Sequence, residues 1–212
     1  MTDLVPFDLV LTARQSVERG LNHATTGNAS TRTADGFWIT PSGFALDLIE
    51  ESQLVRLSLQ GKTLGGFHAP SSEWRMHRDI YRARPTVGAI LHTHPPFATT
   101  LACLRMELPA VHYMLAATGA HSVRCAAYAT YGTEALSRAV LAALGESDAC
   151  LLANHGLLTV GDGADDALHR AEEVEAIAGY YVRGLAVGRP TVLGERETDA
   201  VMRQIRPPVE PV

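Results

Sequence analysis

The chain has 212 residues, of which 46% are hydrophobic and 19% are charged, and its formal net charge is −5 at pH 7. These values are ordinary for a soluble globular protein and sufficient for one domain with a sizeable core. They exclude the strongly basic surface that attracts nucleic acid or an anionic membrane, and no run approaches the ~18 consecutive apolar residues of a transmembrane helix. We therefore expect neither nucleic acid nor a membrane as a partner.

Hydrophobic periodicity and turn residues predict an alternation of helices and short strands along the chain. The predicted helices cover residues 7–21, the segment from about 73 to the residue before Pro85, 96–104, 133–144, 163–187 and roughly 195–205. The predicted strands cover residues 30–32, 37–40, 54–59, 86–92, 149–153 and 157–161, and GKTLGG (61–66) is predicted to be a turn. This mixture indicates a single α/β domain, layered around one sheet over residues 1–205, with a proline-rich tail at 206–212.

The three cysteines point to a reducing compartment. They are Cys103, Cys125 and Cys150, an odd number. No two of them form a CxxC motif, and each lies among small or apolar residues. We expect reduced core thiols rather than disulfides, as in a cytoplasmic protein. The N-terminal residues include acids and no basic stretch, so a secretory signal peptide is not expected either.

Two histidines stand where an apolar predicted strand ends. Residues 88–97 read GAILHTHPPF, so His92 and His94 follow an apolar run and precede two prolines. Side chains two residues apart on a strand point to the same face, and two imidazoles so placed can bind one divalent cation. His155 follows a second apolar strand and precedes Gly156, which allows close approach of the backbone. Each histidine alone is as readily a hydrogen-bonded core residue, but the three together match a catalytic zinc site with an open position.

Glu73 is the carboxylate that could complete such a site, and two interpretations of it remain open. It lies in the segment PSSEW, where a predicted helix begins. An acid in the first turn complements the helix dipole, which is worth about 0.3–1 kcal/mol. Alternatively, Glu73 is a fourth metal ligand that can leave the metal and act as an acid or base. Sequence spacing does not decide between them.

Three loops are rich in small hydroxyl and amide residues, which suits phosphate binding by an acidic protein. Backbone N–H groups and helix N-termini bind phosphate without lysine or arginine. The same loops are also ordinary turns and a helix N-cap when each is taken singly. The candidate phosphate ligands in these loops are Asn28, Ser42, Gly43, Ser71 and Ser72.

Seven segments, in order along the chain, resemble the class II aldolase/adducin superfamily, and the L-fuculose-1-phosphate aldolases within it in particular. They are GNASTR (27–32), ITPSG (39–43), PSSEWRMH (70–77), AILHTHPP (89–96), VHYMLAATG (111–119), YATYGTEALS (128–137) and ANHGLL (153–158). HTH with a distant HG and an upstream SSEW is specific to this superfamily. The resemblance implies a central, mostly antiparallel sheet between helical layers, and homotetramers with active sites at subunit interfaces.

The resemblance also implies a reaction and a role for each matching residue. The reaction is reversible cleavage of a ketose 1-phosphate, such as L-fuculose 1-phosphate, to dihydroxyacetone phosphate and a short aldehyde such as L-lactaldehyde. The implied zinc ligands are His92, His94 and His155, one Zn²⁺ per subunit, and Glu73 is the mobile ligand and acid/base. The implied phosphate ligands are Asn28, Ser42, Gly43, Ser71 and Ser72. Tyr113, in VHYM, matches a tyrosine that helps to handle the aldehyde. Mn²⁺ or Co²⁺ also suit three histidines and a carboxylate.

One departure from the resemblance and several alternatives remain. Fuculose-phosphate aldolases carry a tyrosine near the C-terminus, whereas the last tyrosine here is Tyr181. Sibling enzymes use the same histidines to decarboxylate sugar-acid phosphates, epimerise pentulose 5-phosphates or dehydrate methylthioribulose phosphate. Adducin-type heads bind the cytoskeleton but have lost the metal ligands, which are present here. A Schiff-base aldolase is disfavoured, because the only lysine, Lys62, lies in a predicted turn.

Overall fold

A computed structural model describes residues 6–205, so the proline-rich tail predicted at 206–212 lies outside the described residues. The helices are α1 (Phe7–Glu18), α2 (Trp74–Ala83), α3 (Pro96–Cys103), α4 (Glu134–Leu144), α5 (Ala164–Val187) and α6 (Glu195–Ile205), with short 3-10 helices η1 (Leu46–Leu48), η2 (Glu51–Gln53) and η3 (Tyr113–Thr118). The strands are β1 (Asn28–Arg32), β2 (Gly36–Ile39), β3 (Val55–Ser58), β4 (Thr63–Gly65), β5 (Ala89–Thr93), β6 (Leu108–Pro109), β7 (Ser122–Val123), β8 (Cys125–Ala126), β9 (Ala149–Leu152) and β10 (Gly156–Gly161).

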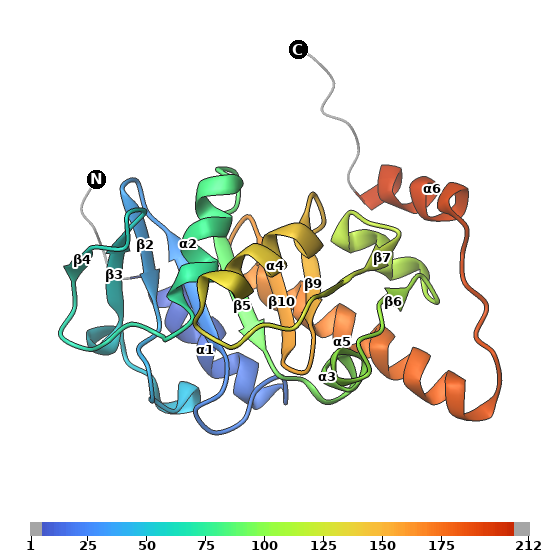
Figure 1. The fold of residues 1–212 in the computed structure, drawn as a ribbon, viewed down its shortest axis with the longest axis horizontal. Helices are drawn as coiled ribbons and strands as arrows, with labels where there is room; N and C mark the ends of the chain where they lie inside the picture. Colours follow the sequence, from blue (N-terminus) through green and yellow to red (C-terminus); the bar gives the residue numbers. More distant parts are fainter. Residues whose placement is uncertain (1–5, 206–212) are drawn as a thin grey trace, which may run out of the picture.

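One sheet of eight strands forms the centre of the molecule, in the order β4-β3-β2-β1-β5-β10-β9-β8 (Figure 1). All neighbouring pairs are antiparallel except β8 and β9, which are parallel. The prediction of a mostly antiparallel sheet is therefore confirmed. Strand β5 lies between β1 and β10, and this register sets His92 opposite Asn28 on one side and Leu158 on the other.

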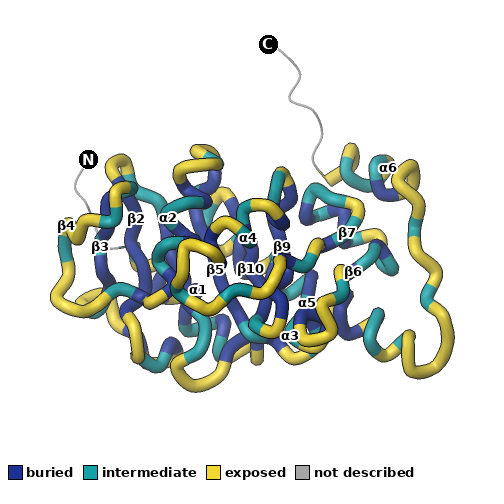
Figure 2. Tube along the Cα trace, viewed as in Figure 1, coloured by how far each residue is buried: buried dark blue, intermediate teal, exposed yellow. Residues whose placement is uncertain are grey.

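Two hydrophobic cores cover the two faces of this sheet, because successive side chains of a strand point to opposite faces. Leu91 of β5 packs in the core that includes residues of α1, α3 and α5, whereas its neighbour Ile90 packs in the core that includes residues of α2 and α4. All of β5 is buried, as the dark blue centre of Figure 2 shows. Burying a large apolar side chain such as Leu91 or Ile90 is worth about 1.5–3 kcal/mol. The predicted α/β domain with helical layers on both sides of the sheet is confirmed.

Two sequence-based expectations are wrong. Residues Thr63–Gly65 form β4, an exposed edge strand paired with β3, where a turn was predicted. Three residues are too few for alternation to be recognised, so the pairing decided their conformation. Cys103 is exposed rather than a core thiol, since α3 turns Ala98, Leu101 and Ala102 toward the core and leaves Cys103 on the opposite side.

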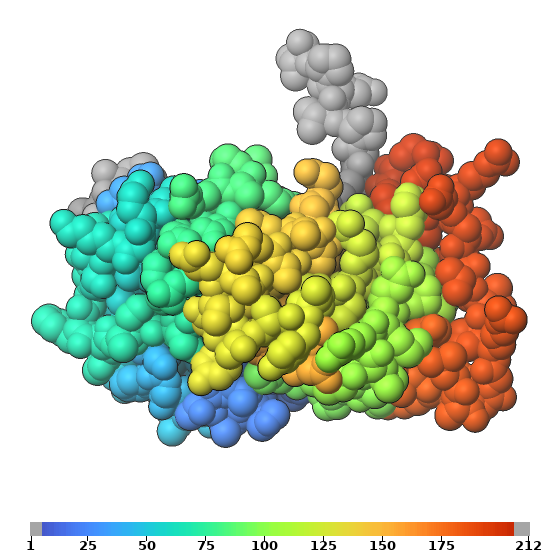
Figure 3. Space-filling model, viewed as in Figure 1, coloured from blue at the N-terminus to red at the C-terminus, as the bar shows by residue number. Residues whose placement is uncertain are grey.

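The C-terminal part of the chain lies at the end of the molecule opposite to β4 (Figure 1). After α5, the chain returns so that α6 packs against η3, and Leu193 N–H donates to the carbonyl of Ala110 at 2.9 Å. His121 Nδ1 and Thr198 Oγ1 lie 2.5 Å apart in the same region. Figure 3 shows this segment in orange and red at one end of the molecule. Among residues 6–205, no helix combines the length and apolar character that crossing a bilayer demands.

Candidate active site

His92 is placed by the central strand with one ring nitrogen already engaged. Its side chain is fully buried, and its Nδ1 lies 2.9 Å from the carbonyl oxygen of Leu157 on β10. A carbonyl oxygen can only accept, so Nδ1 carries a proton and Nε2 is the ring atom that faces His94, His155 and Glu73. Such a contact fixes the tautomer and orientation of histidines that bind metals.

His94 and His155 present their own Nε2 atoms to the same point. The Nε2 atom of His92 lies 3.0 Å from that of His94 and 3.2 Å from that of His155. His94 follows the last residue of β5, where its backbone N–H donates to the carbonyl of Leu21 and to the side chain of Asn22. His155 lies in the tight turn between β9 and β10. The structure therefore brings together three histidines from two places in the chain that lie about sixty residues apart.

Gly156 is required for this close approach, as its place after His155 suggested. A Cβ atom there would lie 2.4 Å from the carbonyl oxygen of Thr93 and 2.7 Å from Cδ2 of His94. Both distances are far below van der Waals contact, so any side chain would push β10 away from β5. The His155 turn could then no longer meet the other two imidazoles.

The three imidazoles and Glu73 form a donor set that fits a divalent cation. Burial, and then the neighbouring histidines, lower the pKa of His94 to about 3, while burial and His92 lower the pKa of His155 to about 4. Both rings are therefore neutral near pH 7, with a lone pair to donate. The Oε1 atom of Glu73 is buried with no hydrogen-bond partner. Buried lone pairs that face one another without donors between them are the arrangement that a bound cation satisfies.

Glu73 lies beside the histidines rather than only at the start of a helix. It is the N-cap of α2, yet its side chain makes no capping hydrogen bond. Its Oε2 lies 3.2 Å from Nε2 of His92, and its Oε1 lies 3.5 Å from Nε2 of His155. Burial alone would raise the pKa of Glu73, but attraction to His92 and His155 and hydrogen bonds from His92 and Asn28 outweigh it and hold that pKa well below its usual range. The carboxyl group is therefore ionised. Glu73 in turn raises the pKa of His92 against the effect of burial.

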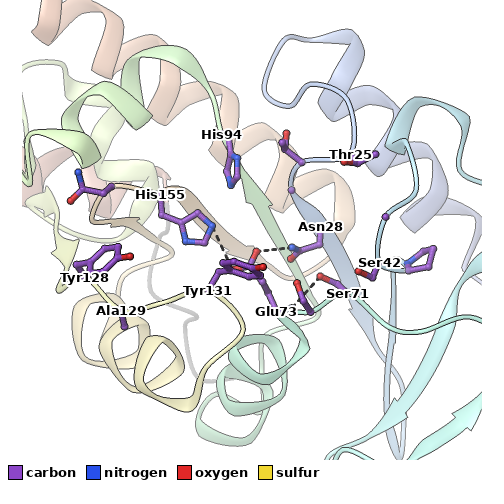
Figure 4. A pocket seen from close by; sticks show the side chains of 16 residues that line it. Thr25, Asn28, Ser42, Ser71, Glu73, His94, Tyr128, Ala129, Tyr131 and His155 are labelled. Carbon is purple, nitrogen blue, oxygen red and sulfur yellow. Dashed lines mark hydrogen bonds and ion pairs between the residues drawn. The ribbon is translucent and has the colours of Figure 1, made fainter.

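The predicted phosphate ligands all line one pocket of about 380 Å³ together with Glu73, His94 and His155 (Figure 4). They are Asn28, Ser42, Gly43, Ser71 and Ser72. Two of the loops are held side by side by a bridge, in which Ser42 N–H donates to Ala69 and Ser71 N–H donates to Thr40, both at 3.0 Å. Among the described residues that line the pocket, none is lysine or arginine. An anion there would be bound by hydroxyl and backbone N–H groups.

Tyr113 is the predicted site residue that lies away from both this pocket and the histidine cluster. It begins η3, is 53% exposed and contacts the ring of His112, with 4.7 Å between ring centroids. Two other tyrosines, Tyr128 and Tyr131, also line the pocket (Figure 4). Neither tyrosine was predicted to act in the site, although both lie in the YATYG segment that carries part of the resemblance.

Comparison with known proteins agrees with this geometry. Residues 7–182 match the model of the class II aldolase and adducin N-terminal domain. The chain is 44% identical over 198 residues to the 5-methylthioribulose-1-phosphate/5-deoxyribulose-1-phosphate aldolase of Rhodospirillum rubrum, covering 93% of this chain and 89% of that protein. It is 39% identical over 199 residues to the L-fuculose phosphate aldolase of Escherichia coli K12, covering 93% and 92%.

A solved structure shows the same fold over almost the whole chain. An L-fuculose 1-phosphate aldolase superposes with a TM-score of 0.94 at 38% identity, and the match covers 97% of this chain and 98% of that one. The fold, the family model and the relatives thus agree with one another over both the sheet and the histidine-bearing segments. The protein belongs to the class II aldolase and adducin family, close to the fuculose-1-phosphate aldolases.

Proposed function

We propose that this enzyme is a zinc-dependent aldolase that reversibly cleaves a ketose 1-phosphate, such as L-fuculose 1-phosphate, to dihydroxyacetone phosphate and a short aldehyde. One observation carries the proposal. Three imidazoles, of which those of His94 and His155 are neutral near pH 7, and an ionised carboxylate meet at one wall of a pocket whose other wall consists of hydroxyl and glycine loops. Metal-ligand donors on one side and anion donors on the other match the carbonyl and the phosphate of a phosphorylated ketose.

The residues of this chain divide the work between binding and proton transfer. Ser42, Gly43, Ser71 and Ser72 would hold the phosphate and orient the sugar, so that binding energy far from the reacting carbons is used for alignment. A zinc ion held by the three histidines would supply Lewis-acid polarisation of the substrate carbonyl. Cleavage removes the proton of the carbon-4 hydroxyl, breaks the bond between carbons 3 and 4, and adds a proton at carbon 3. Glu73, ionised and facing the histidines, would carry the proton that carbon 3 gains.

The relatives differ in the aldehyde half of the sugar phosphate for which they are named. The relative from Rhodospirillum rubrum is named for 5-methylthioribulose 1-phosphate and 5-deoxyribulose 1-phosphate, and the one from Escherichia coli for L-fuculose phosphate. In all three sugars, the carbons beyond the cleaved bond end in a small apolar group. Tyr128 and Tyr131 line the same pocket and would offer apolar surface to such a group.

A panel of phosphorylated sugars tests the proposal directly. Purified enzyme with zinc is expected to release dihydroxyacetone phosphate from at least one of L-fuculose 1-phosphate, 5-methylthioribulose 1-phosphate and 5-deoxyribulose 1-phosphate, with one equivalent of aldehyde. The ranking of kcat/KM assigns the substrate, because that ratio reports binding of the transition state. Release of carbon dioxide from a sugar-acid phosphate, or epimerisation of a pentulose 5-phosphate, without any dihydroxyacetone phosphate from the panel would instead indicate a sibling activity.

Tyr113 would act in the pocket of a neighbouring copy, as expected for a homotetramer with active sites at subunit interfaces. Its exposed ring on η3 supports this assignment, since it is free to contact another subunit. Tyr113→Phe and His94→Ala are each expected to impair cleavage alone. Mixed tetramers are prepared by dissociation and reassembly of equal amounts of both variants. About a quarter of their sites should combine an intact His94 from one variant with an intact Tyr113 from the other, and these sites should regain activity. No recovery in tetramers shown to be mixed would argue against a shared site.

A further inference from the structure

A continuous row of buried hydrogen bonds lies behind Glu73, on the side away from the histidines. The Nδ2 of Asn28 lies 3.0 Å from Glu73 Oε2, and the Oδ1 of Asn28 lies 2.6 Å from Nε2 of His77. Beyond it, Nδ1 of His77 lies 2.7 Å from Ser30 Oγ, which lies 2.8 Å from the hydroxyl of Tyr81. All five side chains are buried, and His77 is 0% exposed.

The ionised carboxylate at one end gives every bond in this row a defined direction. Glu73 can only accept, so Asn28 must present its NH₂ group to it and its carbonyl oxygen to His77. His77 must then donate from Nε2, which leaves Nδ1 as an acceptor for the hydroxyl of Ser30. Ser30 in turn accepts from Tyr81. Burial, reinforced by His92, lowers the pKa of His77 to about 3, which agrees with a neutral ring carrying a single proton.

Helix α2 and the sheet register explain why these groups meet. Glu73 is the N-cap of α2 and His77 lies four residues later, so both face the same side of the helix. Asn28, the first residue of β1, pairs with His92 on β5, and its amide bridges Glu73 and His77. The amide group therefore spans one turn of α2 at the level of the histidine cluster, and a flip of that amide would place its carbonyl oxygen against the carboxylate.

We propose that His77 is a positioning residue, which sets the orientation of the Asn28 amide and thereby holds the carboxylate of Glu73 against His92 and His155. It does not reach the pocket, so it acts only through Asn28. Its effect on zinc follows from the donor set, and its effect on catalysis rests on the function proposed above. Side chains that orient a metal ligand from behind typically change metal affinity or activity by about 10- to 100-fold when they are removed.

Two amide substitutions at His77 separate this role from a merely structural one. In His77→Gln, the side-chain NH₂ takes the place of Nε2 and can still donate to Asn28. In His77→Asn, the shorter amide takes the place of Nδ1, keeps a partner for Ser30 and leaves Asn28 without its donor. Tyr81→Phe is the control, because it removes a buried hydrogen bond of the same row while Ser30 can still donate to His77. Each full-length variant is assayed for zinc affinity against a chromophoric chelator, for kcat and KM, and for melting temperature.

His77→Asn should lower zinc affinity and kcat each about 10- to 100-fold, whereas His77→Gln and Tyr81→Phe should stay within about threefold of wild type. KM should change less than kcat in all variants, because four of the five predicted phosphate ligands, Ser42, Gly43, Ser71 and Ser72, lie outside this row. Equal losses in His77→Asn and His77→Gln, or losses that follow the melting temperature, would overturn the assignment.

The two proposals fail in different ways. A wild-type protein that binds zinc but cleaves no ketose 1-phosphate contradicts the proposed function, and the zinc affinities of the variants still decide the role of His77. A wild-type protein that binds no zinc contradicts both.

Discussion

Removal of the metal is expected to lower kcat/KM for the cleaved ketose 1-phosphate by about 10³-fold or more, since loss of Lewis-acid stabilisation costs several kcal/mol. His94→Ala should have the same effect, because only two of the three imidazole donors remain. The measurement is bound zinc per subunit by elemental analysis, with dihydroxyacetone phosphate release assayed on the same samples. About one zinc per chain in the wild type, lost together with activity in the variant, is the expected result.

Lys62→Ala is the matched control for this experiment. Lys62 is the only lysine of the chain, it is exposed, and it lies in the turn between β3 and β4 at the edge of the sheet. A Schiff-base mechanism would need an amine in an apolar pocket. We expect the variant to keep wild-type activity and zinc content. Activity that survives rigorous removal of metal, or that disappears with Lys62, would contradict the zinc mechanism. The activity that Zn²⁺, Mn²⁺ or Co²⁺ each restores to the metal-free enzyme ranks the three metals.

Glu73→Gln should lower kcat about 10²- to 10⁴-fold while zinc remains bound, because proton transfer by a positioned side chain contributes in that range. Glutamine keeps the shape of the side chain and can still accept from Asn28, but it cannot take up a proton at neutral pH. The three histidines remain to hold the metal. The measurement pairs kcat with zinc content, so that loss of the base is separated from loss of the metal.

Glu134→Gln serves as the control for Glu73→Gln. Glu134 is also an acid at the beginning of a helix, but it is exposed in the first turn of α4, where it makes a 3.9 Å ion pair with Arg138. Such a surface pair is worth about 0–1 kcal/mol, and activity should not change. If Glu73→Gln kept kcat within about threefold of wild type with zinc bound, another group would have to carry the proton.

Local sequence patterns predicted most of the helices and strands because their periods are properties of short segments. Helical spacing of apolar residues predicted a helix over 163–187, and α5 spans Ala164–Val187. An apolar run predicted a buried strand at 86–92, and β5 spans Ala89–Thr93. The edge strand β4 was missed because three residues carry no recognisable period. The family resemblance, rather than any period, predicted the antiparallel order of the sheet.

The site divides in the same way between what the sequence determined and what the tertiary structure decided. The sequence alone determined that His92 and His94 share a strand end and that Gly156 follows His155. Only the pairing of β5 with β10 decided that His155 meets the other histidines, and only the packing of α2 decided that Glu73 faces them.

Residues whose roles depend on partners far away in the chain were invisible to sequence patterns. His77 has an ordinary position within an amphipathic helix, and its link to Glu73 passes through Asn28 from another strand. Tyr113 carries a family motif, yet within one chain it lies away from the pocket. Local periodicity reports which face of an element a side chain occupies. Which faces meet depends on strand register and helix packing, and these are decided by contacts between distant segments.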